Sequence, residues 1–252
     1  MAGIAAACGA GRGAGDLLAT DAGARRRLHA DGRLASRPRV SGRGSPPFGL
    51  IPLQLSGSDR DGAVYVPPSF RQDRPAPLVL TLHGAGGSGR RRLGRLQQLA
   101  DADGLILLAP DSRGTTWDAA GTGAFGPDVE FVDRALDLVF ARYAVDSSRV
   151  VAEGFSDGAS YALSLGLLNG DLFTHVIAFS PGFLTEGSRR GKPRLFVAHG
   201  TEDRVLPIDR CSRRIVRELR GGYDVRYTEF AGGHTIPDGI ARAAMDWLAG
   251  RP

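Results

Sequence analysis

The sequence predicts an α/β protein with a mostly parallel central sheet and helices on both faces. From about residue 50 to the end, short apolar runs bounded by turn residues alternate with longer segments of helical spacing. Strands that alternate with helices in this way are typical of βαβ units, whose strands pair in parallel. Such crossovers are right-handed, which places helices on both faces of the sheet. The 252 residues suffice for one such domain with a sizeable core.

Three strands are expected in the first half of this region. Residues 63–66 form a short apolar run that ends at Pro67 and Pro68, and proline at a strand end is typical of a sheet edge. Residues 78–82 and 105–109 are almost entirely apolar and have the length of a strand. Runs without polar alternation indicate strands that are buried on both faces.

Four further strands and five helices complete the prediction. The runs at 150–153, 176–179, 195–198 and 225–230 are again short and bounded by turn residues, and the first three are mostly apolar. Between strands, apolar residues recur every three or four positions, the spacing of an amphipathic helix. The helices are expected at 93–103, 129–143, 158–168, 208–220 and 240–248. Because the connection between the strands at 176–179 and 195–198 is short, we expect no large cap domain.

The first 48 residues differ from the rest in composition. They are rich in glycine, alanine and arginine, so they cannot bury enough apolar surface to order themselves. We therefore expect a disordered tail at 1–48 and a folded domain at 49–252. A short helix near 28–34 is the alternative for part of the tail.

The charge distribution argues against nucleic acid as a partner. Residues 1–45 hold eight arginines and three aspartates, which equals the whole formal net charge of +5. The remaining residues are neutral in sum, whereas a surface that binds phosphate backbones is basic. Two cysteines are too few for a disulfide framework, and no apolar stretch has the length of a membrane span. We expect a cytoplasmic protein with a small-molecule partner; the sequence indicates no oligomeric state.

Residues 154–158, Gly-Phe-Ser-Asp-Gly, match the pattern G-x-S-x-G between the strand at 150–153 and the helix at 158–168. A serine in such a strand–turn–helix connection exposes its hydroxyl at the carboxyl end of the sheet. The adjacent helix N-terminus favours developing negative charge. This setting predicts that Ser156 is a nucleophile. A plain glycine–serine turn before a helix gives the same pattern, so the prediction depends on the other motifs.

A glycine-rich turn, His-Gly-Ala-Gly-Gly at 83–87, directly follows the strand at 78–82. Glycines in such a turn let backbone N–H groups point into a site. We expect the N–H groups of Ala85 and Asp157 to form an oxyanion hole, which stabilises the negative oxygen of a tetrahedral intermediate.

The same turn also matches a dinucleotide-binding pattern. Gly84, Gly86 and Gly89 fit G-x-G-x-x-G, and Asp111 partly mimics the acidic residue that contacts a ribose. A nucleotide site would leave the remaining motifs of the chain unexplained, so this alternative is disfavoured.

Two further candidates follow late strands. Glu202 and Asp203 lie in the loop after the strand at 195–198, and His234 lies in a Gly-Gly-His turn after the strand at 225–230. A carboxylate and a histidine at the carboxyl ends of neighbouring strands can reach a serine hydroxyl. The chain order serine, acid, histidine is the order found in α/β-hydrolases. Chemistry alone leaves the choice between the two acids open.

With these motifs the sequence resembles the phospholipase/carboxylesterase branch of the α/β-hydrolases, which includes the acyl-protein thioesterases. The resemblance runs from about residue 50 to the C-terminus, and its most specific part is His-Gly-Thr-Glu-Asp-Arg-Val-Leu-Pro at 199–207. It implies the α/β-hydrolase fold and places the acid of the catalytic triad at Asp203. Asp157 departs from the branch, which usually has an uncharged residue after the nucleophile.

The resemblance also implies an activity. We expect cleavage of a carboxylic ester or thioester through an acyl-enzyme on Ser156, with His234 as general base and without metal or cofactor. Trp117 and Phe125, in the long connection at 111–128, are expected to bind substrate as walls of an acyl pocket. The alternative is a non-catalytic protein of the same fold that binds a small molecule.

Overall fold

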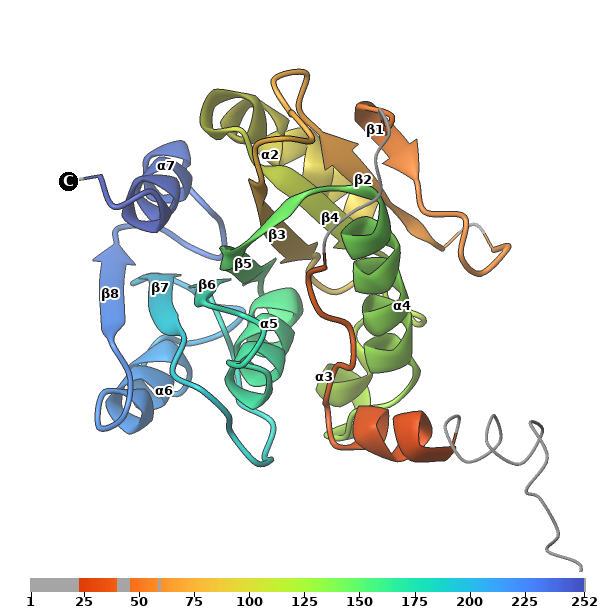
Figure 1. Ribbon diagram of the computed structural model, residues 1–252. Helices are drawn as coiled ribbons and strands as arrows, with labels where there is room; N and C mark the ends of the chain where they lie inside the picture. The colour runs from red at the N-terminus through yellow and green to blue at the C-terminus, as the bar shows by residue number, and fades with distance from the viewer. Residues whose placement is uncertain (1–22, 40–45, 59, 252) are drawn as a thin grey trace, which may run out of the picture.

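The computed structural model describes residues 23–39, 46–58 and 60–251 (Figure 1). At its centre is an eight-stranded sheet with the order β1-β2-β4-β3-β5-β6-β7-β8. β2 pairs in antiparallel with β1 and β4, and all other neighbouring strands pair in parallel. The expected mostly parallel sheet is therefore confirmed.

The elements follow the expected order along the chain. The strands are β1 (Gly49–Pro52), β2 (Gly62–Val66), β3 (Ala76–Leu82), β4 (Ile106–Pro110), β5 (Val145–Phe155), β6 (His175–Phe179), β7 (Arg194–Gly200) and β8 (Val225–Phe230). Residues 23–30 are helical, slightly before the short helix considered at 28–34, and the further helices are α2 (Gly89–Asp103), α3 (Asp118–Thr122), α4 (Pro127–Arg142), α5 (Asp157–Leu168), α6 (Ser212–Leu219) and α7 (Asp238–Leu248). The sequence did not predict β1 and α3, because both are too short to show a periodic pattern.

The two faces of the sheet pack against different helices. Along β3, Leu78 and Leu80 belong to a hydrophobic cluster with side chains of α4, α5 and α6. Val79, between them, belongs to a second cluster with side chains of α2 and α7. Successive side chains of a strand point to opposite faces, so a strand covered on both sides needs the continuous apolar run seen here. Figure 1 shows these two sets of helices on opposite faces.

Nothing is inserted between β6 and β7. Their connection, residues 180–193, contains no helix, as expected for a fold without a large cap domain. Within the described ranges, every helix is too short or too polar to cross a membrane.

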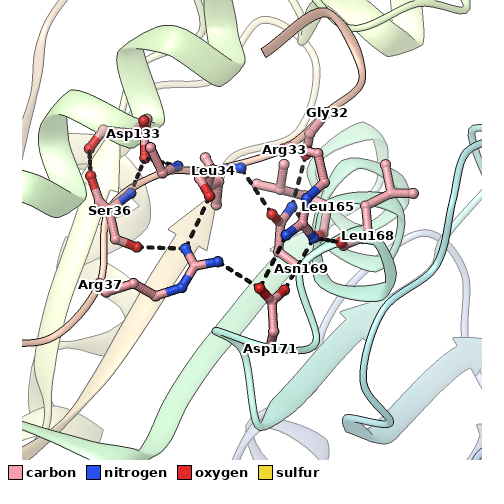
Figure 2. Close-up of polar contacts among 11 residues, drawn as sticks. Gly32, Arg33, Leu34, Ser36, Arg37, Asp133, Leu165, Leu168, Asn169 and Asp171 are labelled. Carbon is pink, nitrogen blue, oxygen red and sulfur yellow. Dashed lines mark hydrogen bonds and ion pairs between the residues drawn. The ribbon is translucent and has the colours of Figure 1, made fainter. Parts of the chain in front are cut away.

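Part of the expected tail is packed against the body of the protein. We call residues 32–37 the N-terminal strap; its Leu34 is buried, and its backbone bonds to side chains at α4 and α5 (Figure 2). The carboxylate of Asp133 on α4 accepts hydrogen bonds from two successive strap amides at 3.0 and 2.8 Å. The side-chain amide of Asn169, just after α5, accepts from one strap amide and donates to a strap carbonyl.

Two arginines of the strap add an ion-pair cluster. The guanidinium groups of Arg33 and Arg37 lie 3.0 and 2.6 Å from Oδ2 of Asp171. Partial burial would raise the pKa of Asp171, but the two guanidinium groups outweigh it and lower this pKa to about 2. Residues 23–39 thus differ from the disordered tail expected for 1–48, because their partners are distant residues that composition cannot reveal. Residues 1–22 and 40–45 of the expected tail lie outside the described residues.

Replacing Asp133 by Ala is expected to lower the free energy of unfolding by about 2–4 kcal/mol, because the buried amide of Ser36, the part-buried amide of Ala35 and the buried ring of His29 lose their partner. Urea denaturation measures the change. Asp137→Ala is the control: its exposed pair with Arg39 is worth less than about 1 kcal/mol. Equal losses in the two variants would contradict a stabilising role of the strap.

Candidate active site

Ser156 lies in a tight turn between β5 and α5. Its φ of 57° and ψ of −124° lie in the positive-φ region that residues other than glycine rarely adopt, so the backbone is strained there. Glycine is needed at both flanking positions, because a side chain there would clash with the neighbouring backbone. A β-carbon at Gly154 would lie 2.1 Å from the carbonyl oxygen of Gly158, and one at Gly158 would lie 2.3 Å from that of Leu82. These close approaches explain why glycine stands on both sides of the serine.

The structure brings Ser156, His234 and Asp203 together. Nε2 of His234 lies 2.8 Å from Oγ of Ser156, and Nδ1 lies 2.6 Å from Oδ2 of Asp203. The histidine loop approaches β7 closely, since a β-carbon at Gly200 would lie 2.3 Å from a carbonyl oxygen of that loop. Glu202, the other acid considered, is exposed at the surface. The geometry therefore matches a serine–histidine–acid arrangement in which Asp203 is the acid.

Four donors surround the carboxylate of Asp203. Oδ1 accepts from the amides of Val205 and Leu206 at 2.9 and 2.8 Å. Oδ2 faces His234 and, at 3.1 Å, Nε2 of His199. Burial would raise the pKa of Asp203, but the hydrogen bonds from Leu206 and His234 outweigh it and lower the pKa. The carboxylate is therefore ionised at neutral pH and can stabilise a histidine cation.

Sequence reasoning did not assign a role to His199. Its side chain is fully buried, and its Nε2 lies within hydrogen-bond distance of two acceptors, Oδ2 of Asp203 and the carbonyl of Leu206. Nε2 therefore carries the ring proton. Burial lowers the pKa of His199, so the ring stays neutral. The only feature of the sequence that could have indicated a role for His199 is its position four residues before the acid, in the pattern His-Gly-x-x-Asp.

The backbone amides of Ala85 and Asp157 are unpaired among the described residues. Ala85 lies in the exposed turn after β3, and Asp157 is the first residue of α5. A β-carbon at Gly84 would lie 3.3 Å from the β-carbon of Ser156, so this turn lies next to the serine. Two unpaired amides beside a serine hydroxyl are the donors that an oxyanion hole needs.

Residues 112–117, which we call the scaffold segment, connect the glycine-rich turn and the serine turn through four hydrogen bonds. The donor–acceptor pairs are Ser112 N–H to His83 Nε2 (3.1 Å), Gly86 N–H to Thr115 O (2.7 Å), Thr116 Oγ1 to Asp157 Oδ2 (2.6 Å) and Trp117 Nε1 to His83 O (2.8 Å). Burial lowers the pKa of His83, so its neutral ring can accept at Nε2. The carboxylate of Asp157 is bound to Thr116, which accounts for a charged residue directly after the serine.

Trp117 and Phe125 lie in the core, not on the wall of an acyl pocket. Trp117 is fully buried and stacks on Tyr161 with 5.1 Å between ring centroids. Phe125 packs edge-on against the same ring at 5.6 Å. A buried side chain cannot touch a substrate unless its packing opens. The prediction that these two aromatic residues bind substrate is therefore wrong. Removing their large apolar surfaces from water is favourable, and this is why both rings lie in the core.

The acidic residue of the dinucleotide alternative is engaged elsewhere. Oδ1 of Asp111 accepts a hydrogen bond from the amide of Gly89 at 2.6 Å, at the first turn of α2. It therefore satisfies a helix N-terminus instead of facing a position where a ribose would lie. The position of Asp111 gives no support to a nucleotide site.

Known proteins similar in sequence are esterases by name, although no protein-family profile matches the chain. The chain is 30% identical over 161 residues to the bifunctional acetylxylan esterase/xylanase XynS20E of Neocallimastix patriciarum, covering 60% of this chain and 22% of that protein. It is 28% identical over 189 residues to probable feruloyl esterase C of Aspergillus flavus, covering 70% of this chain and 68% of that protein. The chain thus matches about a fifth of the first relative and about two thirds of the second.

Similar solved structures include esterases as well. Esterase PE8 superposes with a TM-score of 0.61 at 22% identity, covering 81% of this chain and 100% of that one. The phospholipase/carboxylesterase from Dyadobacter fermentans gives a TM-score of 0.59 at 19% identity, covering 82% of this chain and 98% of that one. These likenesses show that the chain has the α/β-hydrolase fold that its motifs predict.

Proposed function

We propose that this chain is a serine hydrolase that cleaves carboxylic ester bonds through an acyl-enzyme on Ser156. The observation that carries the proposal is the continuous path of hydrogen bonds from Asp203 through His234 to the Ser156 hydroxyl. The names of the relatives, acetylxylan esterase and feruloyl esterase, support ester substrates. Thioesters, whose acyl carbon reacts with the same nucleophile, are a second substrate class of the proposed site.

In the first half of the reaction, Nε2 of His234 takes the proton of the Ser156 hydroxyl as Oγ attacks the acyl carbon. Asp203 accepts the hydrogen bond from Nδ1, fixes the ring tautomer and stabilises the cation. The carbonyl oxygen becomes negative and accepts hydrogen bonds from the amides of Ala85 and Asp157. When the intermediate collapses, the bond to the leaving oxygen breaks, and His234 donates its proton to that oxygen.

In the second half, water replaces the alcohol. His234 takes a proton from a water molecule whose oxygen attacks the acyl carbon of the acyl-enzyme. The bond between this carbon and Oγ of Ser156 then breaks, and the histidine returns the proton to the serine. A carboxylic acid leaves, and every group regains its starting protonation state.

Labelling with a fluorophosphonate probe tests the proposal, because only an activated serine reacts with it. We expect the native protein to gain one adduct in intact-mass spectra and to hydrolyse p-nitrophenyl butyrate. Ser156→Ala should abolish both, whereas Ser147→Ala, a change at an exposed serine, should leave both unchanged. Absence of labelling in the folded native protein would favour the alternative, a non-catalytic protein of this fold that binds a small molecule.

The proposed partner is a small ester or acyl compound. A cytoplasmic location stays a prediction that rests on the low cysteine count; the one cysteine in the described part of the chain, Cys211, is free and buried. Absence of a nucleic-acid partner likewise stays a prediction from the charge distribution.

A further inference from the structure

A small pocket lies beside the proposed oxyanion hole, with a volume of ≈ 160 Å³. Gly84 and Ala85 of the glycine-rich turn form one part of its lining, and Phe155 forms another. Phe155 directly precedes Ser156, and the centroid of its ring lies 4.7 Å from the centroid of the His234 ring. A group bound in this pocket would therefore be part of a substrate whose carbonyl lies at the serine.

Helix α2 supplies three arginines to the pocket, and they differ in their partners. Arg92 is buried and forms an ion pair with Glu153, so its charge is compensated within the protein. Arg91 and Arg95 are exposed, and neither pairs with a carboxylate in the described part of the chain. The lining includes no acidic side chain. The pocket therefore has two uncompensated positive charges.

We propose that this pocket binds a carboxylate carried by the substrate, with Arg91 and Arg95 as its partners. The enzyme would then prefer monoesters of short dicarboxylic acids over neutral esters of the same length. This inference rests on the proposed esterase function. It adds a substrate class that the names of the relatives do not contain.

Size and chemistry support a carboxylate. A pocket of ≈ 160 Å³ has room for about five water molecules at ~30 Å³ each, which suits a short chain with a terminal carboxylate but not a sugar chain. Guanidinium groups bind carboxylates through paired N–H donors. The N-terminal end of α2, whose cap residue Ser88 also lines the pocket, is compensated by the carboxylate of Asp111, so the positive charge offered to a ligand is that of the two arginines.

The test compares two p-nitrophenyl esters of equal chain length, the monoester of glutarate and the neutral valerate. Wild-type protein should have the higher kcat/KM for the glutarate monoester, and raised salt should reduce that advantage. In the double variant Arg91→Gln/Arg95→Gln, kcat/KM for the glutarate monoester should fall about tenfold because KM rises. Its hydrolysis of the valerate ester should stay unchanged. The control Arg214→Gln/Arg217→Gln removes two exposed arginines of α6 and should change neither ester.

Calorimetric titration with free glutarate gives a readout that does not need turnover. Wild-type and Ser156→Ala protein should bind glutarate, and the Arg91→Gln/Arg95→Gln variant should bind it at least about tenfold more weakly. Equal glutarate binding by wild type and the double variant, or none by either, would overturn the carboxylate pocket, even where valerate is hydrolysed. Glutarate binding without hydrolysis of either ester would instead refute the esterase function and leave the pocket standing.

Discussion

Replacing Asp203 by Asn is expected to lower kcat for p-nitrophenyl butyrate by about 10⁴-fold with little loss of folded protein. Oδ1 of the new side chain can still accept from the amides of Val205 and Leu206. Its NH₂ group then faces Nδ1 of His234, where the carboxylate oxygen was. A donor at this position favours the tautomer with the proton on Nε2, and that nitrogen cannot accept the Ser156 proton.

Steady-state kinetics and circular dichroism measure this effect separately from unfolding. Glu202→Gln is the matched control, because the neighbouring carboxylate is exposed and should leave kcat near the wild-type value. An Asp203→Asn protein that is folded and retains wild-type kcat would remove Asp203 from the mechanism.

The lowered pKa of Asp203 also makes stability depend on pH. Its carboxylate contributes stability above the unfolded-state pKa, about 3.9, and this contribution is lost as the pH falls through the lower folded-state pKa. Unfolding measurements below about pH 4 should therefore show a steeper decline for wild type than for Asp203→Asn.

The second large effect concerns stability and not catalysis. Arg92→Met is expected to lower the free energy of unfolding by about 3–5 kcal/mol, because it leaves the negative charge of Glu153 buried without a compensating positive charge. Glu153 is fully buried on β5, three residues before Ser156, and its other carboxylate oxygen accepts from the hydroxyl of Thr81. Urea denaturation measures the loss.

Two matched variants separate the loss of an ion pair from the loss of an arginine. The double variant Arg92→Met/Glu153→Leu should recover most of the stability, because no buried charge then remains. Arg91→Met changes the exposed neighbour on the same helix and should cost much less. If Arg92→Met costs no more than Arg91→Met, the buried pair is not important for stability.

The sequence predicted those parts of the molecule that depend on local patterns. β3, β5, β7 and β8 each contain an expected run, and each is followed by one of the polar motifs. Because parallel strands bring their carboxyl ends to one edge of a sheet, motifs far apart in the chain could be placed together. The β5–α5 turn was predictable for a further reason: the close approaches at Gly154 and Gly158 leave no room for other residues.

Features that depend on contacts between distant segments were not predictable. The strap is ordered by Asp133, Asn169 and Asp171, roughly a hundred residues or more away, and its own composition resembles that of a disordered chain. Trp117 was wrongly expected at a pocket wall, because a loop aromatic carries no local sign of whether it points inward. His199 belongs to the most specific motif but received no role, because the motif does not show that its ring faces the carboxylate of Asp203.

The scaffold segment has a consequence for how this protein can acquire new substrates. A mutation within 112–117 would move the glycine-rich turn and the serine turn together, so altered selectivity there would come with slower chemistry. The exposed arginines of α2 make no such bonds, and substitutions at these positions leave the reacting groups where they are. Natural divergence and laboratory evolution should therefore accept changes on the α2 side of the pocket and eliminate them in the scaffold segment.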